Sequence, residues 1–147
     1  VTEEELAKKI AENKEIGNEG EEEVLKTERE KFREEGRIDL SMTIKQESVT
    51  NAYAGYDIKS YEDKNSKLIE YDKLIEVKTT RSTSPRFFWS SNEIKVAQRE
   101  GEKYWIYLWT NWNSGKERLE RIPNPYKRFF TDSTEKPKCT GYFFDKI

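Results

Sequence analysis

Residues 71–79, which read Tyr-Asp-Lys-Leu-Ile-Glu-Val-Lys-Thr, decide the fold. This apolar and β-branched stretch predicts a strand over Tyr71–Thr79. Successive side chains of a strand point to opposite faces, so Ile75 and Val77 share one face. Glu76 and Lys78 share the other face. A strand with Ile75 and Val77 in a core does not need a Glu and a Lys opposite them unless that second face is covered or used.

Further strands and helices flank this stretch and predict a mixed α/β (α+β) fold. Alternating apolar residues predict the strands Ile38–Gln46, Gly55–Tyr61, Tyr104–Thr110 and Lys116–Ile122. Helical spacing and two capping boxes, Thr2 with Glu5 and Ser90 with Glu93, predict the helices Glu3–Asn13, Glu19–Glu35 and Ser90–Glu100. We expect the connections to be the polar link Glu47–Tyr53, the turns Glu62–Ser66 and Asn113–Gly115, and the loop Thr80–Phe88. Beyond Pro123 we expect an irregular chain whose aromatic residues pack back on the domain: Tyr126, Phe129, Phe130, Tyr142, Phe143 and Phe144.

Length and composition limit the class of protein. A chain of 147 residues fits one domain, 1–147, in which residues 1–16 form a helical lead-in. The sequence holds no His and one Cys, which excludes a His general base, a His-ligated zinc site and a disulfide framework. It also lacks the glycine patterns of phosphate-binding and dinucleotide-binding loops. Any metal chemistry must therefore use carboxylates, which suit Mg²⁺ or Mn²⁺.

The sequence gives hints about location and context. No apolar run approaches the roughly 20 residues of a membrane helix, and no signal-peptide pattern opens the chain, so we expect a cytoplasmic protein without a membrane partner. A first residue Val1 suggests a fragment of a larger protein. Acidic residues are in excess in the first forty positions and basic residues are in mild excess afterwards, which permits a polyanionic partner without requiring one.

Asp57 and Glu76 lie on neighbouring predicted strands and form a possible metal site. Two such carboxylates can converge on one divalent cation, together with a backbone carbonyl, here that of Val77. Lys78 points to the same side as Glu76 and can act on an attacking water or on transition-state charge. Glu21 lies on the apolar face of the predicted helix Glu19–Glu35, which is an unusual place for a carboxylate. Chance placement in a glutamate-rich segment explains Glu21 equally well.

The order of short motifs resembles the NO VEIN C-terminal domain family, which is placed in the PD-(D/E)XK nuclease superfamily. The matching motifs are Gly17-x-x-Gly20-Glu21-x-x-Val24-x-x-x-Glu28, Gly55-Tyr56-Asp57-Ile58-x-Ser60, Ile75-Glu76-Val77-Lys78-Thr79, Asn92-Glu93-Ile94-x-x-Ala97, Tyr104-x-x-Tyr107 and Ile122-Pro123-Asn124-Pro125. The resemblance implies a restriction-endonuclease-like central mixed sheet flanked by helices. It also implies metal-binding roles for Asp57, Glu76 and Glu21 and an active-site role for Lys78. Tyr56 stands where the superfamily's name has proline.

Other matching residues have a structural alternative. Asn92 and Glu93 fit the family pattern, and we expect Asn92 to contact nucleic acid, whereas the capping box already explains Glu93. Glu28 is interpreted as structural or as a support of the site. Arg81 and Arg86 lie on the loop after the Glu76 strand, where they can contact phosphates. The neighbouring aromatics Phe88 and Trp89 are more typical of a core.

The resemblance and the residues together favour a Mg²⁺-dependent (or Mn²⁺-dependent) endonuclease domain that cuts DNA in a restriction or phage-defence system. The alternative is a non-cleaving module with a nuclease fold that binds DNA or a partner within a helicase or ATPase assembly. A purely structural domain would leave the face with Glu76 and Lys78 unexplained. A homodimer is an option, because double-strand cutting by this fold commonly uses two sites. The sequence leaves open DNA or RNA, single or double strands, and specificity.

Overall fold

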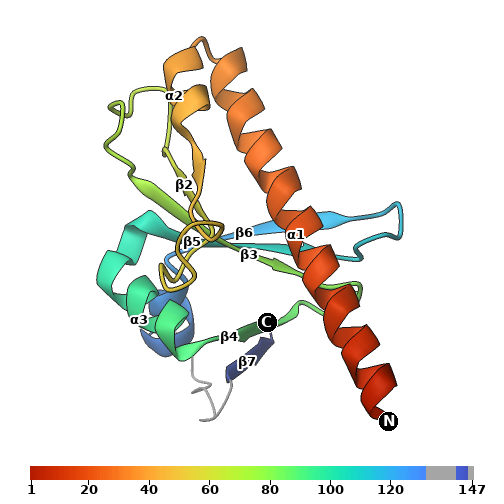
Figure 1. Ribbon diagram of the computed structural model, residues 1–147. Coiled ribbons are helices and arrows are strands. Elements are labelled where there is room, and N and C mark those ends of the chain that lie inside the picture. The colour runs from red at the N-terminus through yellow and green to blue at the C-terminus, as the bar shows by residue number, and fades with distance from the viewer. Residues whose placement is uncertain (132–141, 146–147) are drawn as a thin grey trace.

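The chain folds around a mixed β-sheet with helices on both faces (Figure 1). The computed structural model describes residues 1–131 and, of the remainder, the backbone of residues 142–145. The central sheet has five strands in the order β1-β2-β3-β5-β6, whose bounds are Lys45–Gln46, Ile58–Ser60, Lys73–Thr79, Tyr104–Thr110 and Arg118–Pro123. The α-helices are α1 (Glu3–Glu34), α2 (Ile38–Thr43) and α3 (Ser91–Glu100). This architecture confirms the expected mixed sheet flanked by helices.

The two central strands are the parallel pair of the sheet. β3 runs parallel to β5, and α3 lies between them in the sequence, as a crossover connection requires. The remaining pairs, β1 with β2, β2 with β3 and β5 with β6, are antiparallel. A short 3₁₀ turn, η1 (Gly101–Lys103), leads from α3 into β5. The predicted strand over Tyr104–Thr110 is confirmed at both ends.

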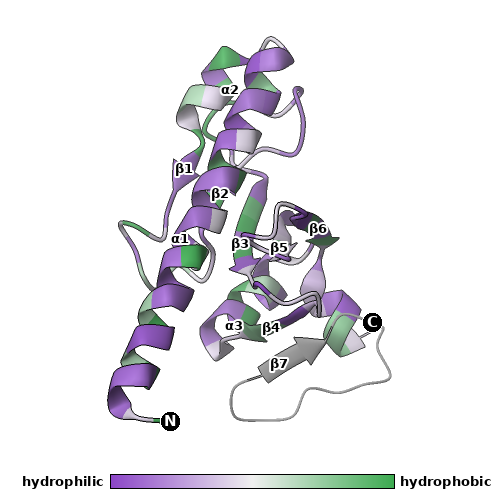
Figure 2. Cartoon of the chain, turned by 90° about the vertical axis from the view of Figure 1, so that its right-hand side faces the viewer, coloured by the Kyte–Doolittle hydropathy of each residue, from purple (hydrophilic) through white to green (hydrophobic). Residues whose placement is uncertain are grey.

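α1 is one continuous helix, whereas the sequence pattern predicted two helices with a break between Asn13 and Glu19. The intervening residues contain no proline, and Ile16 is buried, so nothing interrupts the backbone hydrogen bonds there. The capping box at Thr2 is present, and the helix ends before Gly36, which has a positive φ of 81°. Figure 2 shows that the part of α1 extending beyond the sheet is mostly hydrophilic.

The predicted strand Ile38–Gln46 is wrong over most of its length. Residues 38–43 form the short helix α2, and only Lys45–Gln46 pair as a strand. Leu40 and Ile44 are both buried, and their separation of four residues places them on one side of a helical turn that packs beside α1. The predicted strand Gly55–Tyr61 is shorter than expected, because Gly55 has a positive φ of 79° and pairing begins only at Ile58.

The predicted loop Thr80–Phe88 is wrong over its last three residues. Residues 86–89 form β4 (Arg86–Trp89), which pairs antiparallel with β7 (Tyr142–Asp145) in a separate two-stranded sheet. Trp89 is buried, as expected, and so is Phe87, but the expectation of a core position for Phe88 is wrong. Side chains alternate along β4, which leaves Phe88 45% exposed. The expected packing of the side chains of Tyr142, Phe143 and Phe144 lies outside the described residues.

The segment after Pro123 is more regular than expected, because residues 127–131 form a π-helical turn, η2 (Lys127–Thr131). Its aromatic residues pack back as predicted: Phe129 is buried beside Trp89, and Tyr126 stacks on Phe130 with ring centroids 4.8 Å apart. Within residues 1–131 and 142–145, no helix has both the length and the apolar character needed to cross a membrane.

Two hydrophobic cores cover the two faces of the sheet. Val24 and Phe32 of α1 pack with Ile75, Val77 and Tyr107 on one face. The second core lies under α3 and includes Leu74, Trp89, Ile94, Ala97, Ile106 and Leu108. The predicted alternation along β3 therefore places Glu76 and Lys78 on the α3 side of the sheet, at the end where β2 no longer covers the edge of β3.

Candidate active site

Asp57 caps the open edge of β3. It directly precedes β2, and its backbone N–H donates to the carbonyl of Ile75 at 2.9 Å. Its carboxylate Oδ2 accepts the backbone N–H of Val77 at 2.7 Å. The N–H and C=O of one strand residue point to the same edge of the strand, so the Val77 carbonyl also faces the Asp57 side.

Glu76 places a second carboxylate beside the first in a buried environment. Glu76 is only 5% exposed, and its carboxylate lies close enough to that of Asp57 for the two groups to influence each other's pKa. Burial and the neighbouring charges of Asp57 and Glu93 raise the pKa of Glu76 well above its ordinary value, against the lowering effect of Lys78. Burial and the negative charge of Glu21 raise the pKa of Asp57 to about 7. Crowded carboxylates of this kind disfavour the doubly ionised state in the absence of a cation.

Lys78 is the cation of this cluster. Its Nζ lies 2.7 Å from Oε1 of Glu93 and 3.3 Å from Oε2 of Glu76. Burial lowers the pKa of Lys78, but the two carboxylates outweigh burial and raise it above its ordinary value. The two carboxylates therefore hold a positively charged ammonium group in place, which has three hydrogen-bond donors and no acceptor.

Glu93 also belongs to the site, although the sequence pattern alone did not assign it there. The capping box is present as predicted, since Glu93 N–H donates to Ser90 Oγ and Ser90 N–H donates to Glu93 Oε1. The same carboxylate also accepts from Lys78. The capping explanation was thus correct but incomplete. The family pattern at this position was the one signal in the sequence that pointed beyond it.

Glu21 lies near the two carboxylates but does not hydrogen-bond to them. Its Oε1 accepts from Ser48 Oγ at 2.8 Å and from Gln46 Nε2 at 3.2 Å, and its charge contributes to the raised pKa of Asp57. In the part of the chain that the structure describes, no three Asp, Glu or Cys side chains already form a metal-binding group. The candidate metal-binding carboxylates are thus the pair Asp57 and Glu76, with Glu21 beside them.

The residues from Glu21 to Glu93 fall within one recognisable family domain. The family model described as Protein NO VEIN, C-terminal, matches residues 20–122. The chain belongs to the NO VEIN C-terminal family. No curated protein and no solved structure matches it significantly. The NO VEIN match takes in α3 and the central sheet up to Ile122 of β6, and it leaves the first half of α1 and everything after Ile122 outside.

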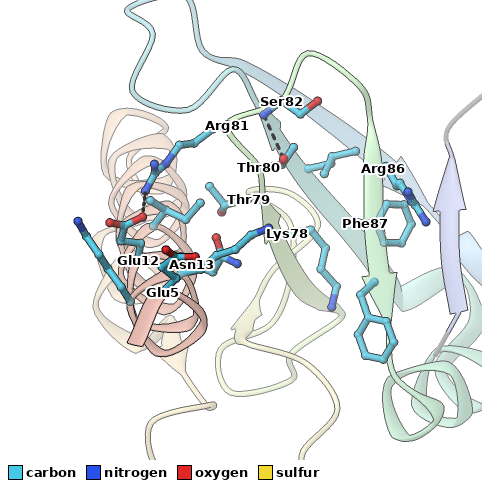
Figure 3. A pocket seen from close by; sticks show the side chains of 15 residues that line it. Glu5, Glu12, Asn13, Lys78, Thr79, Thr80, Arg81, Ser82, Arg86 and Phe87 are labelled. Atoms are coloured by element: carbon cyan, nitrogen blue, oxygen red, sulfur yellow. Dashed lines mark hydrogen bonds and ion pairs between the residues drawn. The ribbon is translucent and has the colours of Figure 1, made fainter. Parts of the chain in front are cut away.

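A cleft opens beside the site of this NO VEIN domain, between the first half of α1 and β4 (Figure 3). Its volume is about 870 Å³, and Lys78 lines it from the end of β3. Among the described residues, the basic lining residues are Lys8, Lys9, Lys78, Arg81 and Arg86, and the acidic ones are Glu5 and Glu12. An ion pair between Arg81 and Glu12, at 3.8 Å, links the loop after β3 to α1.

The structure separates the three residues expected to bind nucleic acid. Arg81 and Arg86 both line the cleft. Asn92 instead uses its side-chain amide to donate to the carbonyl of Tyr53 at 3.0 Å, which ties the link before β2 to α3. Asn92 thus positions the segment that carries Asp57.

Glu28 belongs to a second buried polar cluster on the α1 face of the sheet. Its carboxylate accepts from Ser60 Oγ at 3.0 Å and lies 3.4 Å from Lys73 Nζ. Lys73 also lies over the rings of Trp105 and Tyr107. Glu28 therefore links α1 to β2 and β3 on the face away from Glu76, in agreement with a structural reading.

Proposed function

We propose that this chain is a metal-dependent endonuclease domain that hydrolyses DNA phosphodiester bonds, with an active site of the PD-(D/E)XK kind. The observation that carries the proposal is the arrangement along β3: the Asp57 carboxylate accepts from Val77 N–H beside buried Glu76, and the Lys78 ammonium lies 3.3 Å from Glu76. A buried pair of like charges destabilises the fold, so its presence favours a functional role over a structural one.

Asp57 and Glu76 fit a hard divalent cation such as Mg²⁺ or Mn²⁺. Both pKa values are raised by burial and by neighbouring negative charge, and a cation between the carboxylates would relieve that repulsion. The Val77 carbonyl would add a third oxygen, and Glu21, which is held beside the pair by Ser48 and Gln46, would act as an extra ligand or through a water. Oxygen donors of this kind are the ligands that Mg²⁺ prefers. When bound, such an ion supplies Lewis acidity and lowers the pKa of water.

Lys78 acts in this scheme through its charge. Because Glu76 and Glu93 raise the pKa of Lys78, the ammonium keeps its proton at neutral pH and does not accept one from water. It faces the cleft, where it can donate hydrogen bonds to a phosphate and stabilise the negative charge that develops during cleavage. The Val77 N–H holds the Asp57 carboxylate in position, so this side chain needs little reorganisation to bind a cation.

The cleft supports a polyanionic substrate. Lys8 and Lys9 from α1 and Arg81 and Arg86 from the other wall place four cations along the approach to Lys78. Phosphate contacts of this kind supply most of the sequence-independent affinity for nucleic acid. The family resemblance adds a restriction or phage-defence context and a helicase or ATPase partner to the proposal. The cytoplasmic location is proposed from the lack of a membrane-spanning or signal-peptide pattern, and a homodimer is proposed because double-strand cutting by this fold commonly uses two sites.

A second candidate function is a non-cleaving module that binds DNA or a protein partner. The observation that favours it is the weak overall charge, −2, since free-standing DNA-binding domains usually carry a stronger basic surface. The pairing of Arg81 with Glu12 reduces the net charge of the cleft further.

Cleavage of supercoiled plasmid separates the two functions. We expect nicking with Mg²⁺ or Mn²⁺, none in EDTA, and a rate reduced by about 10²–10³ in Lys78→Ala. Lys78→Ala should bind DNA nearly as well as the parent at fixed salt, because one phosphate contact is a small part of such an interface. If the parent cuts neither plain nor modified DNA with any divalent metal while Lys78→Ala abolishes binding, the site is a phosphate-binding pocket.

A further inference from the structure

Lys78 is a long side chain at the edge of a cleft, and something must hold its ammonium in place. Its side chain is 15% exposed, and it contacts two carboxylates, those of Glu76 and Glu93. The contact to Glu93 is the shorter, 2.7 Å against 3.3 Å. In the proposed function Glu76 is also a metal ligand, so its oxygens are shared with the cation.

Glu93 is itself fixed by the start of α3. Its Oε1 accepts the backbone N–H of Ser90 at 3.1 Å, and its own N–H donates to Ser90 Oγ at 3.2 Å. As the third residue of α3, it also lies in the first turn of the helix, where the helix dipole stabilises a negative charge. One carboxylate oxygen therefore joins a rigid helix N-terminus to the Lys78 ammonium.

We propose that Glu93 is the positioning residue of Lys78 and, through it, a determinant of the cleavage rate. The inference rests on the proposed function, because it assigns Glu93 to the proposed site of cleavage. Among the described residues, Glu93 hydrogen-bonds with Ser90 and Lys78 and not with the two proposed metal ligands. Lys78 without Glu93 would keep only the carboxylate that the metal also requires.

The chain offers a matched pair of variants that separates positioning from capping. Glu93→Gln keeps a residue that capping boxes accept at this position and removes only the charge. Ser90→Ala removes the Ser90 Oγ bond and destabilises the start of α3, but it leaves the Ser90 N–H and the contact between Glu93 and Lys78 intact.

The test measures two independent quantities in both variants. The first is the single-turnover cleavage rate, which is compared with the dissociation constant for DNA. We expect Glu93→Gln to lower the rate by about 10- to 100-fold, as supporting residues of metal sites typically do, with little change in the dissociation constant. Ser90→Ala should lower the melting temperature yet keep the rate. In a Lys78→Ala background, Glu93→Gln should change the rate by less than about two-fold.

The second quantity is independent of cleavage. The Lys78 ammonium group can be followed by NMR in protein labelled with ¹⁵N-lysine, and its signal assigned by its loss in Lys78→Ala. We expect the signal to disappear or shift in Glu93→Gln and to persist in Ser90→Ala. A wild-type rate and an unchanged signal in Glu93→Gln, or equal rate losses in both variants, would overturn the positioning role. If no variant cuts DNA, the proposed function fails by itself, and the NMR signal alone decides whether Glu93 holds Lys78.

Discussion

The backbone N–H of Val77 donates to Oδ2 of Asp57 at 2.7 Å, so the proposed metal-binding carboxylate also serves as a hydrogen-bond partner for the open edge of β3. The side chain replaces the pairing that β2 provides further along, where Ile58 lies opposite Ile75. Asp57 thereby has a structural function and a proposed catalytic one. The structural function needs only an oxygen that accepts a hydrogen bond, whereas the proposed metal binding needs the negative charge.

Asp57→Asn should stabilise the metal-free protein. Asparagine keeps an oxygen that can accept from Val77 and removes a carboxylate whose pKa burial and Glu21 raise to about 7. A carboxyl with a raised pKa binds its proton more tightly in the folded state, so its contribution to stability falls as pH rises from about 4 to about 7. We expect Asp57→Asn to raise the free energy of unfolding by about 1–3 kcal/mol at pH 8 and by little at pH 4.

Urea denaturation in EDTA at both pH values measures this effect. Asp39→Asn is the control, because Asp39 is exposed and its pKa is lowered through the hydrogen bond from Arg37. That variant should not be stabilised at either pH. Equal stability of Asp57→Asn and the parent across the range would mean that the Asp57 carboxylate is well solvated.

Glu21→Gln should weaken metal binding while leaving the fold intact. The side chain accepts from Ser48 and Gln46, and an amide can preserve one such bond, so we expect a small change in melting temperature. Loss of a charge beside Asp57 should reduce Mn²⁺ affinity by about 10-fold or more, the scale of supporting metal-site residues. Isothermal titration calorimetry with Mn²⁺ provides the measurement. An unchanged affinity would restrict Glu21 to orienting the link before β2.

Replacing Lys8 and Lys9 together by alanine should weaken DNA binding without altering the active-site cluster. Both residues line the cleft from the half of α1 that lies outside the family match. Each lost phosphate contact should reduce the slope of log affinity against log salt by about 1, so the double variant should lose about 2. Fluorescence anisotropy over a salt series tests this. A parallel series on Lys26→Ala and Lys31→Ala, at positions outside the cleft lining, should leave the slope unchanged.

Gly20→Ala should destabilise the packing of α1 on the sheet. A Cβ at Gly20 would collide with the Thr79 hydroxyl and crowd Trp109, whose indole N–H donates to the Gly20 carbonyl at 3.2 Å. Overpacking of this kind costs about 1–3 kcal/mol. Among the described residues, no neighbouring atom lies within 4 Å of a Cβ added at Gly17, so Gly17→Ala should stabilise the helix by up to about 1 kcal/mol. Thermal melts of the two variants should therefore shift in opposite directions.

The sequence predicted those elements whose signals are local. The alternation in β3 and β5 and the capping boxes at Thr2 and Ser90 appear within a few residues, and the structure contains all of them. α2 was missed because Leu40 and Ile44 fit a strand or a turn of helix equally well until α1 packs beside them. β4 was missed because its partner β7 lies more than fifty residues further along the chain.

In the candidate site, too, local signals could be predicted and tertiary contacts could not. Spacing along β3 was enough to place Glu76 and Lys78 on one face, and strand order brought Asp57 next to them. The contact between Glu93 and Lys78 depends instead on how α3 crosses over the sheet, a tertiary relationship that no local pattern encodes. Asn92 was given a nucleic-acid role on sequence grounds, whereas in the structure its amide is already engaged by the backbone of Tyr53.

The continuity of α1 makes distant positions mechanically dependent on one another. At 1.5 Å per residue, Lys8 in the wall of the cleft lies about 20 Å along the same helix from Glu21 beside Asp57. The buried residues Val24 and Phe32 anchor the C-terminal half of α1 in the core, whereas most residues of its first turns are exposed. We expect a tilt of the first turns of α1, imposed by an occupant of the cleft, to move Glu21 as well, and so to couple occupancy of the cleft to the electrostatics of the carboxylate pair.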